Sequence, residues 1–67
     1  MDVETLQTAV ASDDPALGLR AVVALRRLAD RLEAQHVARA RLLGWSWEQV
    51  GDALGTSRQA AHKKHGK

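Results

Sequence analysis

The fold is decided by residues 45–65, which have the sequence W-S-W-E-Q-V-G-D-A-L-G-T-S-R-Q-A-A-H-K-K-H. Ser46 and Gln49 have the spacing of a capping box. In that motif the serine and the glutamine side chains each bind a backbone N–H group that has no partner within the helix. The stretch therefore predicts a helix over residues 47–54.

A second helix is expected directly after a tight turn. Gly55 ends the first helix, because glycine accepts the positive φ of a helix terminus, and Thr56 or Ser57 caps the next one. The second helix is expected to run to about His65. Gly51 lies inside the first helix, where glycine costs about 1 kcal/mol relative to alanine. We therefore expect a close backbone approach at Gly51, with inner contacts from Val50, Leu54 and Ala61.

Two more helices are expected upstream. The first covers Val3–Ala11, with Asp2 before it as a cap. Pro15 suits the first position of a helix, because its missing N–H group would have no intrahelical partner there. Ala, Leu and Arg then dominate up to Gly44, and these residues favour helix. The sequence therefore predicts one long helix over residues 15–43.

These elements predict an all-α fold with four helices: a short N-terminal helix, one long helix and a C-terminal helix-turn-helix. The chain is expected to form a single helical domain over residues 1–67. Its parts are an N-terminal helix with an acidic turn over 2–14, the long helix over 15–43 and the helix-turn-helix over 44–67.

The chain is too short to bury a large core. A chain of 67 residues buries only about 60% of its unfolded surface, and it has no cysteine for a disulfide. Leu25, Leu28 and Leu32 share one face of the long helix. We therefore expect a homodimer with these three leucines in its interface.

The two ends of the chain carry opposite charges, with an acidic N-terminal stretch and a basic C-terminal one. Residues 1–14 contain four acidic residues and no Lys or Arg, whereas residues 53–67 contain four Lys or Arg residues and no acid. A basic end of this kind attracts polyanions. A solvated tail has the same composition, so charge alone leaves both interpretations open.

The helix after Gly55 carries side chains that match the groups exposed on DNA. Arginine binds O6 and N7 of guanine, and glutamine binds N6 and N7 of adenine. Base contacts are therefore expected from Ser57, Arg58, Gln59, His62 and Lys63. Hydroxyl groups at a helix start and lysine side chains bind phosphate. Phosphate contacts are expected from Thr56, Lys64 and Lys67.

Residues 44–64, G-W-S-W-E-Q-V-G-D-A-L-G-T-S-R-Q-A-A-H-K-K, resemble the bacterial helix-turn-helix family in its homeodomain-like, sigma-factor-region-4-like version. The resemblance implies a three-helix core that includes the end of the long helix, and sequence-specific binding of double-stranded DNA. Family members carry an apolar anchor where this chain has Lys64 and His65. The resemblance therefore implies a weak attachment at the end of the last helix.

The sequence thus predicts a small bacterial DNA-binding protein, a transcriptional regulator that reads the major groove with the helix that starts at Ser57. Two other functions stay open. The helix-turn-helix is also compatible with a protein-interaction module that binds RNA polymerase, a sigma factor or another regulator. It is equally compatible with a non-specific, nucleoid-associated DNA binder.

Other classes of function are not expected. The sequence offers no nucleophile–base pair with a third orienting group, so we predict no enzyme, catalytic residue or cofactor. His62 and His65 lack further metal ligands nearby in the sequence, so no metal site is predicted. The longest uninterrupted apolar run, Ala21–Leu25, is far too short to span a membrane. The start of the chain lacks a signal-peptide pattern, so a cytoplasmic, nucleoid location is expected.

Overall fold

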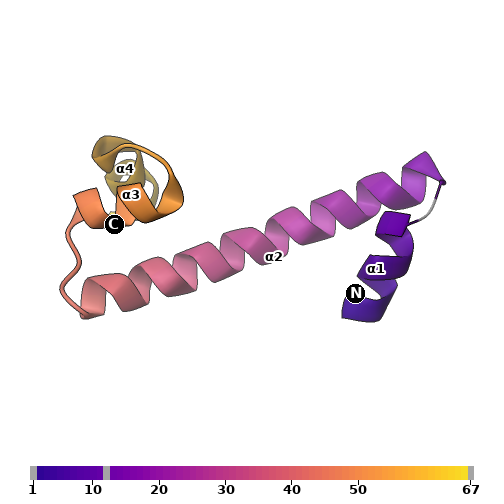
Figure 1. Ribbon diagram of the computed structural model, residues 1–67, viewed down its shortest axis with the longest axis horizontal. Coiled ribbons are helices and arrows are strands. Elements are labelled where there is room, and N and C mark those ends of the chain that lie inside the picture. Colours follow the sequence, from indigo (N-terminus) through magenta and orange to yellow (C-terminus); the bar gives the residue numbers. More distant parts are fainter. Residues whose placement is uncertain (1, 12, 67) are drawn as a thin grey trace. The chain divides into compact units, whose positions relative to one another are not determined.

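The computed structural model describes the backbone of residues 2–11 and 13–66, and the side chains of residues 2–8 and 13–66. The described chain contains four helices and no strand. They are α1 (Val3–Ala11), α2 (Pro15–Leu42), α3 (Trp47–Leu54) and α4 (Arg58–His65) (Figure 1). The predicted all-α fold, with a long second helix and two short C-terminal helices, is confirmed.

The chain forms two compact units, Met1–Arg31 and Leu32–Lys67. The first half of α2 belongs to the first unit and its second half to the second unit. Within the described residues, no helix combines the length and the hydropathy that crossing a bilayer requires.

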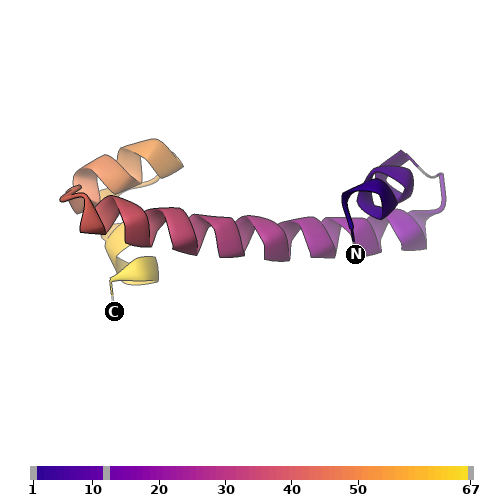
Figure 2. The same ribbon diagram turned by 90° about the horizontal axis from the view of Figure 1, so that it is seen from below.

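In the first unit, α1 packs against the first turns of α2 (Figure 2). Asp2 caps α1 as predicted, because its Oδ1 accepts a hydrogen bond from the backbone N–H of Thr5 at 2.7 Å. This hydrogen bond lowers the pKa of Asp2 below its ordinary value of 3.8. The apolar core of the unit consists of Leu6, Ala21, Leu17 and Ala24.

Helix α2 ends at Leu42, one residue before its predicted end. Gly44 follows with φ +89°. The N–H of Trp45 donates to the carbonyl of Ala40 at 3.0 Å, and the N–H of Gly44 donates to the carbonyl of Arg41 at 3.1 Å. This pair of bonds is a Schellman motif, which satisfies the last carbonyl groups of the helix.

The starts of α3 and α4 are fixed by side-chain caps. Ser46 Oγ accepts a hydrogen bond from the N–H of Gln49 at 3.1 Å, and Gln49 Oε1 accepts one from the N–H of Ser46 at 2.8 Å. The predicted capping box is therefore confirmed. Ser57 Oγ accepts a hydrogen bond from the N–H of Ala60 at 3.0 Å. Ser57, and not Thr56, is thus the cap of α4, whose first helical residue is the one after it.

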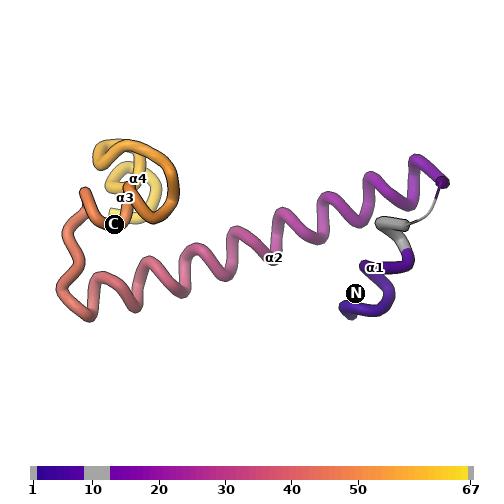
Figure 3. Tube along the Cα trace, in the orientation of Figure 1, coloured from indigo at the N-terminus to yellow at the C-terminus, as the bar shows by residue number. Residues whose placement is uncertain are grey.

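The second unit has a core built from three helices. Val37 of α2, Val50 of α3 and Ala61 of α4 are buried together. Figure 3 shows the chain turning back on itself between α3 and α4. This arrangement agrees with the three-helix core that the resemblance implied. The prediction for Leu54 is wrong, because 38% of it is exposed and it is not among the buried core residues.

Candidate nucleic-acid interface

A short turn joins α3 to α4. Gly55 adopts φ +72°, in the left-handed region that glycine tolerates. Its N–H donates to the carbonyl of Asp52 at 3.2 Å, and the N–H of Thr56 donates to the carbonyl of Gly51 at 2.9 Å. These bonds close α3 and satisfy its terminal carbonyl groups, so the direction in which α4 leaves the turn is fixed by the backbone.

Gly51 lies where this turn crosses α3. A Cβ built at Gly51 would be 2.9 Å from the carbonyl oxygen of Thr56 and 3.0 Å from the carbonyl carbon of Ser57. Both neighbours are backbone atoms, so a larger residue would have to displace the chain itself. The close backbone approach predicted at Gly51 is therefore confirmed.

Helix α4 has a buried side and an exposed side. Ala61 is buried against α2 and α3. Gln59 and Lys63 are each two positions from Ala61, which places them about 200° around the helix from it. Both are exposed, and so is Arg58. The helix contains two lysines, an arginine and no acidic residue, so its exposed side is polar and basic.

The start of α4 presents polar groups. Thr56 and Ser57 are both exposed, and the Ser57 hydroxyl oxygen is occupied by the cap bond to Ala60. The first N–H groups of a helix have no intrahelical acceptors, and they carry the positive end of the helix dipole. A phosphate oxygen is a suitable acceptor for such groups.

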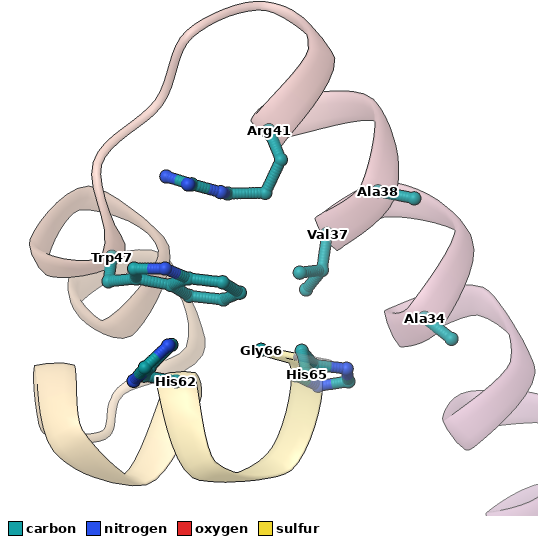
Figure 4. Close-up of a pocket in the computed structure, with 8 residues that line it drawn as sticks. All are labelled: Ala34, Val37, Ala38, Arg41, Trp47, His62, His65 and Gly66. Carbon is teal, nitrogen blue, oxygen red and sulfur yellow. The ribbon is translucent and has the colours of Figure 1, made fainter.

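Among the predicted base-reading residues, His62 has a ring that contacts the indole of Trp47. The centroid of its ring is 5.1 Å from that of Trp47, with the two planes tilted by 53°. Figure 4 shows the indole between the ring of His62 and the guanidinium group of Arg41. The guanidinium carbon of Arg41 is 4.5 Å from the indole centroid. The predicted base contact of His62 would require the ring to leave this indole.

The last turn of α4 is joined to α2 by polar contacts. Glu33 Oε2 is 2.8 Å from Lys64 Nζ and 2.7 Å from His65 Nε2. The bonds from Lys64 and then from His65 lower the pKa of Glu33 below its ordinary value of 4.5. The resemblance implied a weak attachment at this end, and the structure shows polar contacts to Glu33 where an apolar anchor would otherwise lie.

Sequence reasoning missed Glu33 and Arg41. Glu33 is 32 residues from His65, and no local pattern indicates a contact across such a separation. Arg41 carries a weak signal, since it lies in the last turn of α2, where basic residues bind free carbonyl groups. Its Nη1 donates to the carbonyl oxygen of Trp45 at 2.6 Å.

The remaining predicted site residues lie outside α4. Leu25, Leu28 and Leu32 are exposed on α2, by 41%, 40% and 46%. Lys67 lies outside the described residues. The structure thus brings Thr56, Ser57, Arg58, Gln59 and Lys63 together at the turn and on α4.

No protein-family model matches this chain, and neither does any curated protein or solved structure.

Proposed function

We propose that this protein binds double-stranded DNA and reads the major groove with the exposed side of α4, as a regulator of transcription. The observation that carries the proposal is the backbone approach at Gly51, 2.9 Å from the Thr56 oxygen. This approach holds the short basic helix α4 against α2 and α3, with its polar side exposed. A rigidly held, exposed helix of this kind fits the major groove.

Base reading is proposed for the exposed residues near the start of α4. Arg58 suits guanine, and Gln59 suits adenine, because each side chain matches two groups on the base edge. Ser57 and Lys63 lie within reach of the same groove. His62 contributes less in this proposal, since its ring is against Trp47.

Phosphate binding is proposed for Thr56 and Lys64 at the two ends of α4. Lys64 pairs with Glu33, but its side chain remains 58% exposed. A surface pair of this kind is weak, so a phosphate can share or replace Glu33. Each lysine or arginine that neutralises a phosphate releases a counterion, so binding weakens as the salt concentration rises.

A homodimer is part of the proposal. Leu25, Leu28 and Leu32 are large apolar side chains that stay 40–46% exposed. A second copy that covers these leucines buries apolar area, which favours association. Two copies bring two recognition helices to one DNA site, and a dimer of this class reads half-sites about 34 Å apart.

The proposal is tested by fluorescence anisotropy with a labelled random-sequence duplex at about 50 mM and about 200 mM salt. We expect saturable binding that weakens strongly at the higher salt concentration. Lys63→Ala should weaken binding, whereas Arg26→Ala removes an equal charge from the exposed surface of α2 and should not. The absence of binding at low salt would contradict the proposal.

A second candidate function is a protein-interaction module. It is favoured by Leu42 and Leu43 at the end of α2, which are 89% and 69% exposed. Adjacent exposed leucines are typical of protein-binding surfaces. An association with a transcription protein that survives nuclease treatment and high salt would favour this candidate. Competition with unrelated duplex DNA separates the proposed transcriptional regulator from a non-specific, nucleoid-type DNA binder.

A further inference from the structure

A pocket of about 560 Å³ lies in the second unit, between α2 and α4. Its apolar wall is formed by Ala34, Val37 and Ala38 of α2. The rest of its lining includes four side chains with nitrogen atoms, which belong to Arg41 of α2, Trp47 of α3, and His62 and His65 of α4. Figure 4 shows these side chains around one space, with the edge of the indole directed into it. The volume falls within the range of small-molecule sites.

Arg41 supplies a fixed positive charge at this pocket. Its guanidinium group stacks on Trp47 and gives one hydrogen bond to the carbonyl oxygen of Trp45 at 2.6 Å. A guanidinium group has five N–H donors, and a carbonyl oxygen does not neutralise its charge. No carboxylate of the described residues forms an ion pair with Arg41. The arginine is therefore held in place and still suited to bind an anion.

The two histidines add flat surfaces and ring nitrogens. His65 Nε2 is bound to Glu33 Oε2 at 2.7 Å, so its Nδ1 is the nitrogen left for a ligand. The same Glu33 oxygen also accepts from Lys64, so the negative charge of Glu33 is balanced by a lysine. His62 and Arg41 lie on the two sides of the Trp47 indole, so the edge of the indole is the part left for an apolar ligand to contact.

We propose that this pocket binds a small organic anion, namely a carboxylate carried on a flat apolar body. The carboxylate pairs with Arg41, because a guanidinium group matches a carboxylate with two parallel hydrogen bonds. The apolar body lies between the alanine wall of α2 and the edge of the Trp47 indole. A ligand placed there contacts α2 and α4 together.

The site has a consequence for DNA binding that rests on the proposed function. His62 and His65 belong to α4, the helix proposed to enter the groove. A ligand that lies against α2 and the histidines of α4 changes the affinity for DNA to the extent that it binds the DNA-bound and the DNA-free protein with different affinities. By thermodynamic linkage, DNA changes the affinity for the ligand by the same factor.

Binding is tested by NMR on the full ¹⁵N-labelled chain, titrated with benzoate and followed at the indole N–H of Trp47 and the amides of Arg41 and His62. We expect saturable shifts with benzoate. Benzamide has the same ring without the charge, and inorganic phosphate has the charge without the ring, so both should shift these signals much less. No saturable shift with benzoate, or an equal response to phosphate, overturns the proposal.

A carboxylate introduced into the pocket wall tests the site, and the same substitution outside the pocket serves as the matched control. Ala38→Glu adds a carboxylate to the pocket wall with a residue that favours helix, and benzoate affinity should fall by about tenfold or more. Ala29→Glu adds the same charge at an exposed position of α2 that does not line the pocket, and affinity should not change. Circular dichroism verifies that both variants are folded. An Ala38→Glu protein that binds benzoate as the wild type does contradicts the site.

The two proposals fail separately. If the protein binds benzoate but no duplex, the pocket is supported and the proposed function is contradicted. If it binds duplex and does not respond to benzoate, the proposed function is supported and the pocket is contradicted.

Discussion

Gly51 and Thr56 are in direct backbone contact. The N–H of Thr56 donates to the carbonyl of Gly51 at 2.9 Å, and a Cβ at position 51 would stand 2.9 Å from the carbonyl oxygen of Thr56. One residue pair therefore closes α3 and also sets how closely the start of α4 approaches it. The proposed function depends on this contact, because it fixes the side of α4 that stays exposed.

Replacing Gly51 with alanine should destabilise the second unit. Alanine gains about 1 kcal/mol over glycine within a helix, but overpacking against backbone typically costs about 1–3 kcal/mol. We expect a net loss of about 1 kcal/mol, or about 4–8 °C in Tm. Thermal unfolding is followed by circular dichroism, which reports on the helices of both units, and by tryptophan fluorescence, which reports on the second unit because Trp45 and Trp47 both belong to it.

Gly18→Ala is the control for this variant. Gly18 lies in α2, and a Cβ there would meet nothing within 4 Å. Alanine should therefore raise the stability at this position by up to about 1 kcal/mol. A Gly51→Ala protein as stable as Gly18→Ala would show that the turn does not approach α3 closely.

Replacing Glu33 with glutamine should loosen the last turn of α4. The change removes the charge that binds Lys64 and His65. Because these groups are partly exposed, we expect a loss of only about 0.5 kcal/mol in the free energy of unfolding. Asp30→Asn removes an equal charge from an exposed position of α2 and serves as the control. Urea unfolding measures both variants, and equal losses in the two would contradict a specific role for Glu33.

The Glu33 carboxylate also makes the free energy of unfolding depend on pH. Its pKa is lowered in the folded protein from an ordinary value of 4.5, so the folded state favours the charged carboxylate. The stabilisation is fully present above pH 4.5 and is lost as the pH falls through the lowered pKa. The stability of wild type should therefore decline more steeply below pH 4.5 than that of Glu33→Gln. Parallel stability curves would contradict the assigned pairing.

The sequence was sufficient to predict the elements whose ends depend on neighbouring residues. The bounds Val3–Ala11 and Trp47–Leu54 and the capping box at Ser46 follow from residues within one turn of each boundary. The contacts that attach α4 to α2 could not be predicted in this way. They join Glu33 to side chains about thirty positions away, and they depend on how three helices pack. The exposure of Leu54 also depends on how the helices pack. A helical pattern shows that one face is apolar, but it does not show how much of that face a neighbouring helix covers.

Replacing Arg58 with alanine should relax base preference. Each bidentate contact between arginine and guanine is worth about 1–3 kcal/mol of discrimination, whereas a lysine that binds phosphate weakens all sequences alike. Selection of duplexes from a random pool should therefore return a less defined site for Arg58→Ala than for Lys63→Ala. An unchanged preference in Arg58→Ala would contradict base reading by this residue.

Replacing Leu28 with glutamate should dissociate the proposed homodimer. The change places a charge among the exposed apolar side chains of Leu25 and Leu32, and burying an unpaired charge is costly. Sedimentation should give twice the chain mass of 7.3 kDa for wild type and a single chain mass for Leu28→Glu. Leu19→Glu, at another exposed position of α2, should remain dimeric. A wild-type protein with a single chain mass at all concentrations would contradict the dimer.

The most direct measurement is NMR mapping of duplex DNA onto the ¹⁵N-labelled chain. A random-sequence duplex should shift the amide signals of Thr56, Arg58, Gln59 and Lys63 most strongly. Those of α1 should stay unchanged, because α1 carries an acidic residue and no basic one. Shifts concentrated in α1 or on the leucine face of α2, with the α4 signals unmoved, would contradict the claim that α4 reads DNA.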